Sequence, residues 1–428
     1  MSQLALFGGP KTITRPFARY NSIGREEVEA AKAVVESGLL SGFLGSWDPA
    51  FYGGPKVREF GRAWERHFNV KHAVTVNSAT SGLIAAVGAV GVEPGAEVIV
   101  SPWTMAASAT AILIWNAIPV FADIEWETFN LDPASVERNI TQYTQAIMVP
   151  DIFGHSADMD AIMSIARSHH LKVIEDSAQA PGAFYKGRPV GTTADIGVFS
   201  LNYHKHIHTG EGGVCVTNDP TLAERLQLIR NHGEAVVEAK GVEDLSNIIG
   251  FNLRMTEIEA AIGVEQLKKL SALVANRASV AERLTGGLHG LKGLRLPVIK
   301  PECTHVYYAY PMVLREEETG VSRDRIVCAL RAEGVAVADG YCNLHLLPMY
   351  QRRVAYGSSG FPWTGGCYKG NVSYDKGICP VAEELQDKKY MGIGICTYDY
   401  LPEDIDLLAQ AFHKVWDSLP VLEAWRGV

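Results

Sequence analysis

Short apolar runs alternate with segments of helical periodicity between about residues 70 and 220. The short runs predict buried strands, and apolar residues that recur every three or four positions predict helices. We expect strands at residues 73–76, 97–100, 119–122, 146–149, 171–175, 197–201 and 213–217, and helices that include 82–90, 158–168 and 222–230. This alternation of strands and helices predicts an α/β fold with a mostly parallel seven-stranded sheet between two layers of helices.

The rest of the chain follows a different pattern. Apolar residues recur at helical spacing from 256 to 284, which predicts a long helix leaving the large domain. Beyond it we expect a strand at 306–314, a helix at 322–333 and a closing helix at 402–419. These elements predict a smaller α+β domain. We therefore divide the chain into an N-terminal arm that contributes to the site (1–55), a large domain (56–285) and a small C-terminal domain (286–428).

Two segments rich in glycine and aromatic residues have no periodicity, namely 43–54 and 356–371. Long irregular loops in compact domains often form binding sites or lids. The sequence leaves two interpretations open for each: it borders the substrate pocket, or it is a surface excursion or dimer contact.

Two candidate chemical groups follow predicted strands. Asp176 comes at the carboxyl end of the run 171–175, where open parallel sheets place their ligand chemistry. It can hold a ring nitrogen protonated, although helix capping is the commoner role of such an aspartate. Upstream, the strand at 73–76 passes through a small polar turn into a helix, so free backbone NH groups and the hydroxyls of Thr80 and Ser81 are candidates for holding a phosphate.

Lys205 lies between a predicted strand and a glycine-rich turn. This position can present an amine to an aldehyde cofactor, which indicates a Schiff base with pyridoxal 5'-phosphate (PLP). The order phosphate turn, aspartate, lysine is much more specific than any of the three alone.

The chain resembles the DegT/StrS family of PLP-dependent sugar aminotransferases over most of its length. The resemblance is carried by SATSGL (78–83), IPVFAD (118–123), EDSAQA (175–180), SLNYHKHIHTGEGG (200–213) and GFNLRMTEIEAA (250–261). It implies PLP fold type I, with a large PLP-binding domain and a smaller C-terminal one. It also implies transfer of an amino group from glutamate or glutamine to a keto sugar or cyclitol.

The resemblance assigns roles to individual residues. Lys205 is implied to form the Schiff base, Asp176 to pair with the ring nitrogen, and Gln179 to lie near the phenolic oxygen. The implied phosphate ligands are Thr80, Ser81 and Ser200. Asn252 matches an asparagine that reaches the phosphate of the neighbouring subunit, which implies a homodimer with shared active sites.

Two positions depart from the family pattern. An aromatic residue usually follows the threonine of the Pro-x-Thr segment, to stack on the cofactor ring, whereas Met105 stands there and Trp103 precedes the threonine. Trp103 is the better stacker and Met105 is in register, so both remain candidates. At the second position, Asp151 stands where a histidine is usual, and its extra carboxylate would change which substrates fit.

Composition fits a large enzyme of the cytoplasm. The 428 residues are 47% hydrophobic and 20% charged, and the net charge of −9 argues against nucleic-acid binding. No apolar run is long enough to span a membrane, and the first residues do not form a signal peptide. The seven cysteines contain no Cys-x-x-Cys pair, which indicates reduced thiols. His204, His206 and His208 alternate along one segment, yet nothing nearby completes a ligand set, so we expect no metal.

The residues predict a transaminase in which Lys205 moves a proton as general acid and base. The segment 5–17 is similar to that of the cyclitol aminotransferases, which favours an unactivated acceptor. Three alternatives remain. Some family members carry histidine in place of the lysine and are dehydratases, but the spacing puts Lys205 at that position. A PLP-binding regulator without catalysis is the second alternative. A nucleotide-dependent oxidoreductase is the third, although no Gly-x-Gly-x-x-Gly follows an early strand.

Overall fold

Seven strands form the larger sheet of the computed structural model, which describes residues 3–427. They are β1 (His72–Val76), β2 (Glu97–Val100), β3 (Ile118–Phe121), β4 (Thr144–Pro150), β5 (Lys172–Asp176), β8 (Ile196–Ser200) and β9 (Gly213–Thr217). Their order is β1-β9-β8-β5-β4-β2-β3, and β9 runs antiparallel to both of its neighbours while the other pairs are parallel. The expected mostly parallel sheet is confirmed, and each strand lies within two residues of its predicted bounds.

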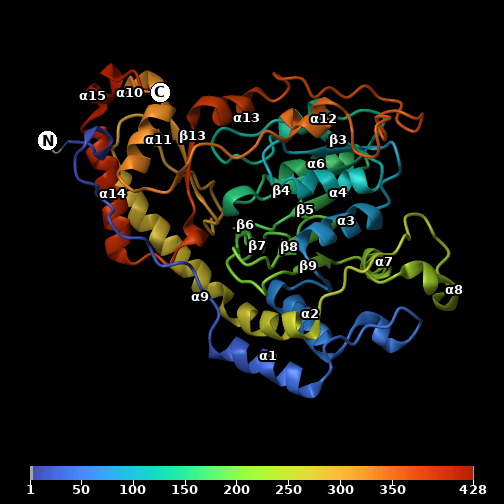
Figure 1. Cartoon of the computed structure of the whole chain (residues 1–428). Helices are drawn as coiled ribbons and strands as arrows, with labels where there is room; N and C mark the ends of the chain where they lie inside the picture. Colours follow the sequence, from blue (N-terminus) through green and yellow to red (C-terminus); the bar gives the residue numbers. More distant parts are fainter. Residues whose placement is uncertain (1–2, 428) are drawn as a thin grey trace.

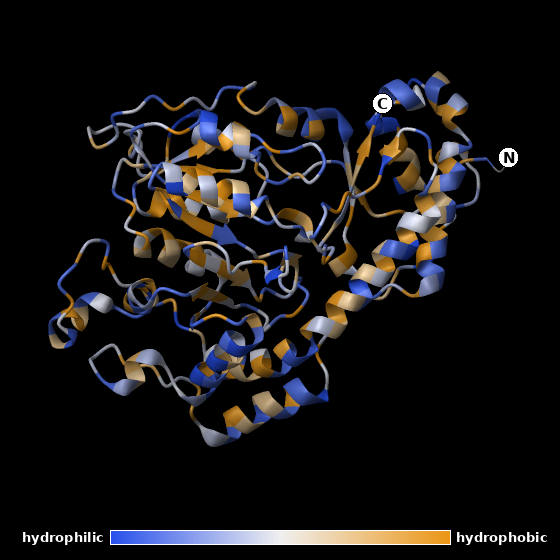
Figure 2. Cartoon of the chain, turned by 180° about the vertical axis from the view of Figure 1, so that it is seen from behind, coloured by the Kyte–Doolittle hydropathy of each residue, from blue (hydrophilic) through white to orange (hydrophobic). Residues whose placement is uncertain are grey.

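Helices cover both faces of this sheet (Figure 1). Those of the first two thirds of the chain are α1 (Arg25–Ser37), α2 (Pro55–Phe68), α3 (Ala79–Ala89), α4 (Ala107–Ile114), α5 (Pro133–Arg138), α6 (Met159–Ser168), α7 (Pro220–Arg230), α8 (Val237–Lys240) and α9 (Glu257–Leu288). Phe60 of α2 and Leu267 of α9 pack in one core with Phe199 of β8, whereas α3, α4 and α6 contribute to the main core. In Figure 2 the strands are hydrophobic along most of their length, as expected for a sheet buried on both faces.

A second sheet of four antiparallel strands lies at the other end of α9 (Figure 1). Its order is β10 (Leu294–Arg295), β11 (Tyr310–Leu314), β13 (Tyr390–Ile393) and β12 (Val337–Ala338). The remaining strands form the hairpin β6 (Phe184–Tyr185) and β7 (Arg188–Pro189). The remaining α-helices are α10 (Glu316–Thr319), α11 (Arg323–Ala332), α12 (Pro348–Gln351), α13 (Pro380–Glu384), α14 (Pro402–Trp416) and α15 (Leu419–Ala424).

Two predicted boundaries in this part are wrong. The strand expected at 306–314 begins only at Tyr310, because Tyr307 has a φ of 51°, which interrupts an extended backbone. The closing helix expected at 402–419 ends at Trp416, and the chain then starts a separate short helix at Leu419.

The N-terminal arm is spread over several parts of the molecule. Leu4 and Ile13 are buried in the core of the smaller sheet, although they are distant from it in sequence. Further along, the rings of Trp47 and Tyr52 lie 4.2 and 4.8 Å from the ammonium of Lys240, so this stretch packs beside α8. The domain division at residues 55 and 285 stays a prediction.

The glycine-rich segment 356–371 and the residues after it cover the free edge of the larger sheet. The hydroxyl of Tyr368 donates to Glu97 of β2 at 2.8 Å, and that of Tyr374 donates to the carbonyl of Pro119 in the edge strand β3. Covering an edge strand prevents it from pairing with another chain. No helix among residues 3–427 has the length and apolar character needed to cross a membrane.

Candidate active site

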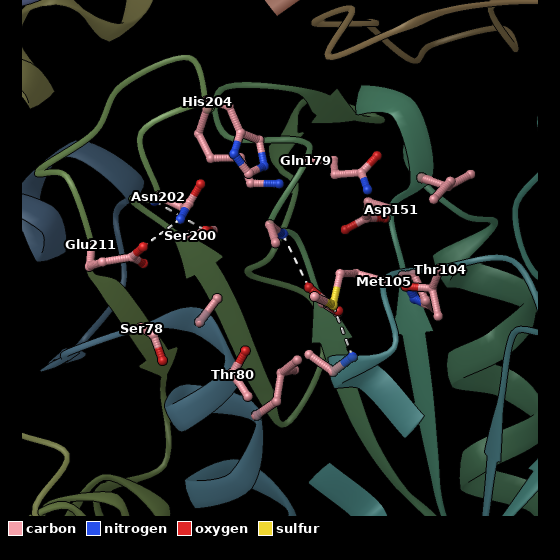
Figure 3. Close-up of a pocket in the computed structure, with 18 residues that line it drawn as sticks. Ser78, Thr80, Thr104, Met105, Asp151, Gln179, Ser200, Asn202, His204 and Glu211 are labelled. Atoms are coloured by element: carbon pink, nitrogen blue, oxygen red, sulfur yellow. Dashed lines mark hydrogen bonds between the residues drawn. The ribbon is translucent and has the colours of Figure 1, made fainter. Parts of the chain in front are cut away.

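A cavity opens at the carboxyl edge of the larger sheet, where β4, β5 and β8 end (Figure 3). Pro150, Asp176 and Ser200 are the last residues of these strands, and all three line the cavity. Because neighbouring parallel strands end at the same edge, residues far apart in sequence meet there. Lys205 and Gln179 also line it.

One end of the cavity is built by the amino terminus of α3. Ser78 caps this helix by accepting a hydrogen bond from the Ser81 NH at 3.1 Å, and Ala79 and Thr80 line the cavity. The turn lies close to Gly213, where a Cβ would be only 2.7 Å from the Ala79 nitrogen, so glycine is needed there. A helix amino terminus with hydroxyls beside it binds anions.

The three predicted phosphate ligands are placed differently. Thr80 and Ser200 line the cavity, which fits their expected role. The Ser81 hydroxyl instead accepts a hydrogen bond from Ser78 at 3.0 Å, and Ser81 is buried without lining the cavity. The backbone NH of Ser81 donates to the same Ser78 side chain, which caps α3.

Asp176 is held in a fixed orientation at the centre of the site. The Ser108 hydroxyl donates to its Oδ2 at 2.7 Å, and the Ala178 NH donates to its Oδ1 at 3.3 Å. Burial raises the pKa of Asp176, while the hydrogen bond from Ser108 opposes that rise. A buried carboxylate with one face toward a cavity can hold a protonated ring nitrogen.

Lys205 is 7% exposed, and its ammonium lies 4.3 Å from the ring centre of Tyr308. Burial lowers its pKa from 10.5 to about 8, although the nearby Asp176 favours the charged form. Desolvation of this kind is a common way to activate a lysine as a nucleophile or base near neutral pH.

Gln179 is oriented by two groups from distant parts of the chain. Its Oε1 accepts from the Phe153 NH at 2.8 Å, and its Nε2 donates to the Tyr341 hydroxyl at 3.1 Å. Burial raises the pKa of Tyr341 to about 12, so this hydroxyl stays protonated at neutral pH. Figure 3 shows Gln179 on the same side of the cavity as Asp151 and Thr104.

Of the two candidates for stacking on a cofactor ring, only Met105 reaches the cavity. Met105 lines it and is 60% exposed. Trp103 is fully buried, its indole NH donates to Asn343 at 2.8 Å, and its ring packs against Phe129 and Tyr390. This aromatic core holds the Trp103 ring away from the cavity, which favours Met105 as the stacking residue.

Asp151 lines the cavity from the end of β4 and is almost fully buried. Its two oxygens accept hydrogen bonds from the Ser177 hydroxyl at 2.7 Å and the Ala157 NH at 3.1 Å. Burial, followed by the nearby Glu175, raises the pKa of Asp151 well above its usual range. This environment favours the protonated form of the carboxyl.

Asn252 does not line this cavity. It is exposed, and its Oδ1 accepts from Arg254 Nε at 2.8 Å. The three alternate histidines also separate: His204 lines the cavity, His206 is fully buried, and His208 lies partly buried outside it. No group of three or more metal-binding side chains is found within residues 3–427.

The groups around the cavity match the three polar parts of PLP. The amino terminus of α3 with Thr80 and Ser200 suits a phosphate, and Asp176 suits a protonated pyridine nitrogen. Lys205 supplies a buried amine, which suits an aldehyde. The residues present therefore fit this cofactor.

Comparison with known proteins agrees with this chemistry. The sequence model of the DegT/DnrJ/EryC1/StrS aminotransferase family matches residues 24–388. The chain belongs to this family. It is a PLP-dependent aminotransferase of fold type I.

Individual relatives match this family member over most of their length. It is 32% identical to the L-glutamine:scyllo-inosose aminotransferase of Streptomyces griseus, over 98% of both chains. It is 33% identical to the spore coat polysaccharide biosynthesis protein SpsC of Bacillus subtilis, over 82% of this chain and 89% of that protein. The X-ray structure of the aminotransferase from Psychrobacter cryohalolentis aligns with a TM-score of 0.79 at 27% identity, over 95% of this chain and 100% of the other.

Sequence reasoning assigned no role to three side chains that lie around the candidate residues in this aminotransferase. Ser108 bonds Asp176, Tyr341 bonds Gln179 and Tyr308 lies under Lys205. Ser108 is one of two polar positions in a mainly apolar helix that directly follows the Pro-Trp-Thr-Met segment, and this was a usable signal. The two tyrosines come from the last third of the chain and carry no local signal.

Proposed function

We propose that this aminotransferase moves the amino group of L-glutamine or glutamate to the ketone of an unactivated cyclitol or free sugar. Two observations support this choice. The Streptomyces griseus relative, which aligns over 98% of both chains, is named for L-glutamine and scyllo-inosose. The second observation is the charge of the side chains that line the cavity.

Few cationic groups line the cavity. Its basic side chains are Lys205 and His204, whereas Asp151, Asp176 and Glu211 are acidic. Burial lowers the pKa of His204, and Lys205 lowers it further, so His204 is mostly neutral at pH 7. A nucleotide-linked sugar carries a diphosphate, which proteins usually bind with arginine or lysine. The lining of this cavity therefore favours an uncharged acceptor, and this is the observation that carries the proposal.

We assign the cofactor contacts from the same geometry. Thr80, Ser200 and the first turn of α3 would bind the phosphate, Asp176 would hold the ring nitrogen, and Lys205 would bind the aldehyde carbon. When bound, PLP supplies an electron sink that stabilises negative charge on the carbon next to the amino group.

Lys205, once the amine of the donor has displaced it from the aldehyde carbon, would act as the proton carrier. Its neutral Nζ removes the proton from the amine-bearing carbon of the donor, and in the second half-reaction Nζ returns a proton to the former carbonyl carbon of the acceptor. The pKa of about 8 leaves part of the amine neutral at pH 7 to 8. Met105 would cover the ring on the side where family members usually carry an aromatic residue.

We further propose that two copies of the chain share their active sites. Asn252 is exposed and lies outside the cavity of its own chain, where it is available to a partner. Leu245 and Ile249, close to it in sequence, expose 58% and 64% of their surface. Exposed apolar side chains near a polar contact favour a protein interface.

All seven cysteines are free, which fits a reducing, cytoplasmic location.

The experiment is a product assay with isotope-labelled L-glutamine and a panel of ketones. The panel holds scyllo-inosose, its 2-deoxy derivative and a nucleoside-diphosphate 4-keto sugar. We expect labelled amine from a cyclitol ketone and none from the nucleotide-linked sugar. Labelled amine formed only from the nucleotide-linked sugar would refute the proposed acceptor class.

The same assay separates the alternatives. A dehydratase would release a deoxy product with or without the amino donor, and a PLP-binding regulator would bind the cofactor and turn over nothing. The buried Lys205 amine beside Asp176 favours transamination over both.

A further inference from the structure

His206, the residue after Lys205, anchors the loop that carries the lysine through two hydrogen bonds. His206 Nε2 donates to the Val306 carbonyl at 2.8 Å, because a carbonyl oxygen can only accept. The carbonyl of His206 accepts from the Tyr20 hydroxyl at 2.6 Å. The first contact joins the loop to the chain segment that also provides Tyr308, over which the Lys205 ammonium lies. The second joins it to the N-terminal arm.

Tyr20 is itself fixed by backbone pairing to the segment after β13. Its NH donates to the Thr397 carbonyl at 3.2 Å, and the Asp399 NH donates to the Ala18 carbonyl at 2.8 Å. Earlier in the arm, the buried carboxylate of Glu333 accepts from the backbone NH groups of Ala5 and Thr12 at 2.8 and 3.0 Å. The arm therefore joins the smaller sheet to the Lys205 loop.

Arg277 of α9 fixes the ring of Tyr20. Its guanidinium carbon lies 3.9 Å from the ring centre, and its Nη1 donates to the Tyr398 carbonyl at 2.9 Å. Arg277 is completely buried, so a stacked cation of this kind holds the ring more firmly than an exposed one would. The hydroxyl of Tyr20 is thereby directed at the His206 carbonyl.

A second contact of the arm supports the same loop. The amide oxygen of Gln266 accepts from both the Ser22 hydroxyl, at 2.6 Å, and the His208 NH, at 3.2 Å. The arm and α9 thus contact the loop at residues 206 and 208, directly after Lys205. Neither Tyr20 nor Ser22 lines the cavity.

We propose that Tyr20 is a positioning residue for Lys205: its hydroxyl holds the His206 carbonyl and so fixes the direction in which the lysine enters the cavity. A shift of the smaller sheet would thereby be transmitted through the arm to the Lys205 amine, although the arm itself does not contact the substrate. This inference rests on the proposed role of Lys205.

The test compares Tyr20→Phe with wild type. The variant keeps the ring over Arg277 and removes only the hydroxyl, which leaves the His206 carbonyl without its donor. We expect the rate constant of the half-reaction with glutamine to fall about fivefold, the effect of losing one ordinary hydrogen bond. The pH midpoint of the bound cofactor's absorbance change is expected to move by about 0.5. In the protein without cofactor, amides 201–213 are expected to exchange hydrogen for deuterium faster.

Tyr310→Phe is the matched control. It removes a hydroxyl that bonds Thr285 at 2.7 Å in the core of the smaller sheet, where it has no contact with the loop. We expect a similar loss of thermal stability but unchanged loop exchange, absorbance midpoint and half-reaction rate. Wild-type loop exchange in Tyr20→Phe, or an equal change in both variants, would overturn the inference. The exchange measurement needs no cofactor, so a wild type that binds no PLP would refute the proposed function separately.

Discussion

The Ser108 hydroxyl donates a 2.7 Å hydrogen bond to Oδ2 of Asp176, and the two residues are 68 positions apart in sequence. Ser108 is completely buried, and its oxygen also lies 2.8 Å from the Thr104 hydroxyl, which lines the cavity. Since the Ser108 proton points to Asp176, Thr104 is the donor of this second bond. A chain of two hydroxyls thus leads from Thr104 in the cavity wall to the Asp176 carboxylate, which also lines the cavity.

Ser108→Ala removes the donor and leaves Oδ2 of Asp176 buried without it. A hydrogen bond to a charged group contributes about 1.5–3 kcal/mol, so we expect the half-reaction with glutamine to slow by roughly tenfold or more. Stopped-flow absorbance of the bound cofactor measures this rate. Thr110→Ala, which removes a hydroxyl of the same helix bonded to the Ala106 carbonyl, serves as control. A Ser108→Ala rate within twofold of wild type would contradict the assigned contact.

Lys205 is expected to lower the stability of the cofactor-free protein. The fall of its pKa from 10.5 to about 8 corresponds to about 3 kcal/mol at pH 7. Between these two values the unfolded chain binds the proton more than the folded one, so stability rises with pH in this window. Lys205→Met is therefore expected to be about 3 kcal/mol more stable than wild type at pH 7, with the difference narrowing to roughly half at pH 9.5.

Urea denaturation at the two pH values measures this difference. Lys268→Met is the control, because the Lys268 side chain is 62% exposed, and it is expected to change stability by less than about 0.5 kcal/mol. A Lys205→Met protein that is less stable than wild type at pH 7 would show that the buried ammonium carries no such penalty.

Asp151→Asn tests whether the Asp151 carboxyl is neutral. The amide keeps the bond from the Ala157 NH and donates to the Ser177 hydroxyl in turn. Because the folded-state pKa of Asp151 is raised, the favourable contribution of the protonated group is present at low pH and is lost as the pH rises through that value. We expect the two proteins to differ little in stability at pH 4, close to the unfolded value of 3.8, and the variant to be more stable at pH 8. A variant that loses stability equally at both would indicate a charged carboxylate.

Met105 and Trp103 are expected to respond in opposite ways to replacement by alanine. Trp103→Ala opens a cavity in a fully packed aromatic core and is expected to cost about 3–5 kcal/mol of stability. Met105→Ala changes a side chain that is mostly exposed, so we expect nearly unchanged stability and weaker PLP binding. Denaturation and cofactor titration of both variants measure the two effects. A stable Trp103→Ala protein with weakened PLP binding would restore Trp103 as the stacking residue.

The larger sheet was predictable because strands buried on both faces are short, continuous apolar runs such as IPVF at β3. The end of the predicted strand at 171–175 then placed Asp176, whereas Ser200 was assigned from the family resemblance. Tyr307 shows the limit of such patterns, since its left-handed backbone conformation shortens an apolar run that looks like one strand. Burial is equally hard to predict: Trp103 and Met105 are two residues apart, and only tertiary packing decides which one reaches the cavity.

Contacts between distant segments could not be predicted from one sequence. Tyr20 comes from the N-terminal arm, and Tyr308 and Tyr341 come from the last third of the chain. They contact His206, Lys205 and Gln179, respectively. The edge-covering role of 356–371 was likewise open, because glycine and aromatic residues suit a lid as well as a sheet cover.

The central claim is that Lys205 holds PLP and carries out the proton transfers of a transamination. The absorbance spectrum of the purified protein tests it most directly, recorded for wild type and Lys205→Ala after PLP is supplied, before and after addition of L-glutamine. We expect a lysine-dependent cofactor band in the wild type that disappears with the donor and is never formed by the variant. The same band in both proteins, or no cofactor band in the wild type, would contradict the account.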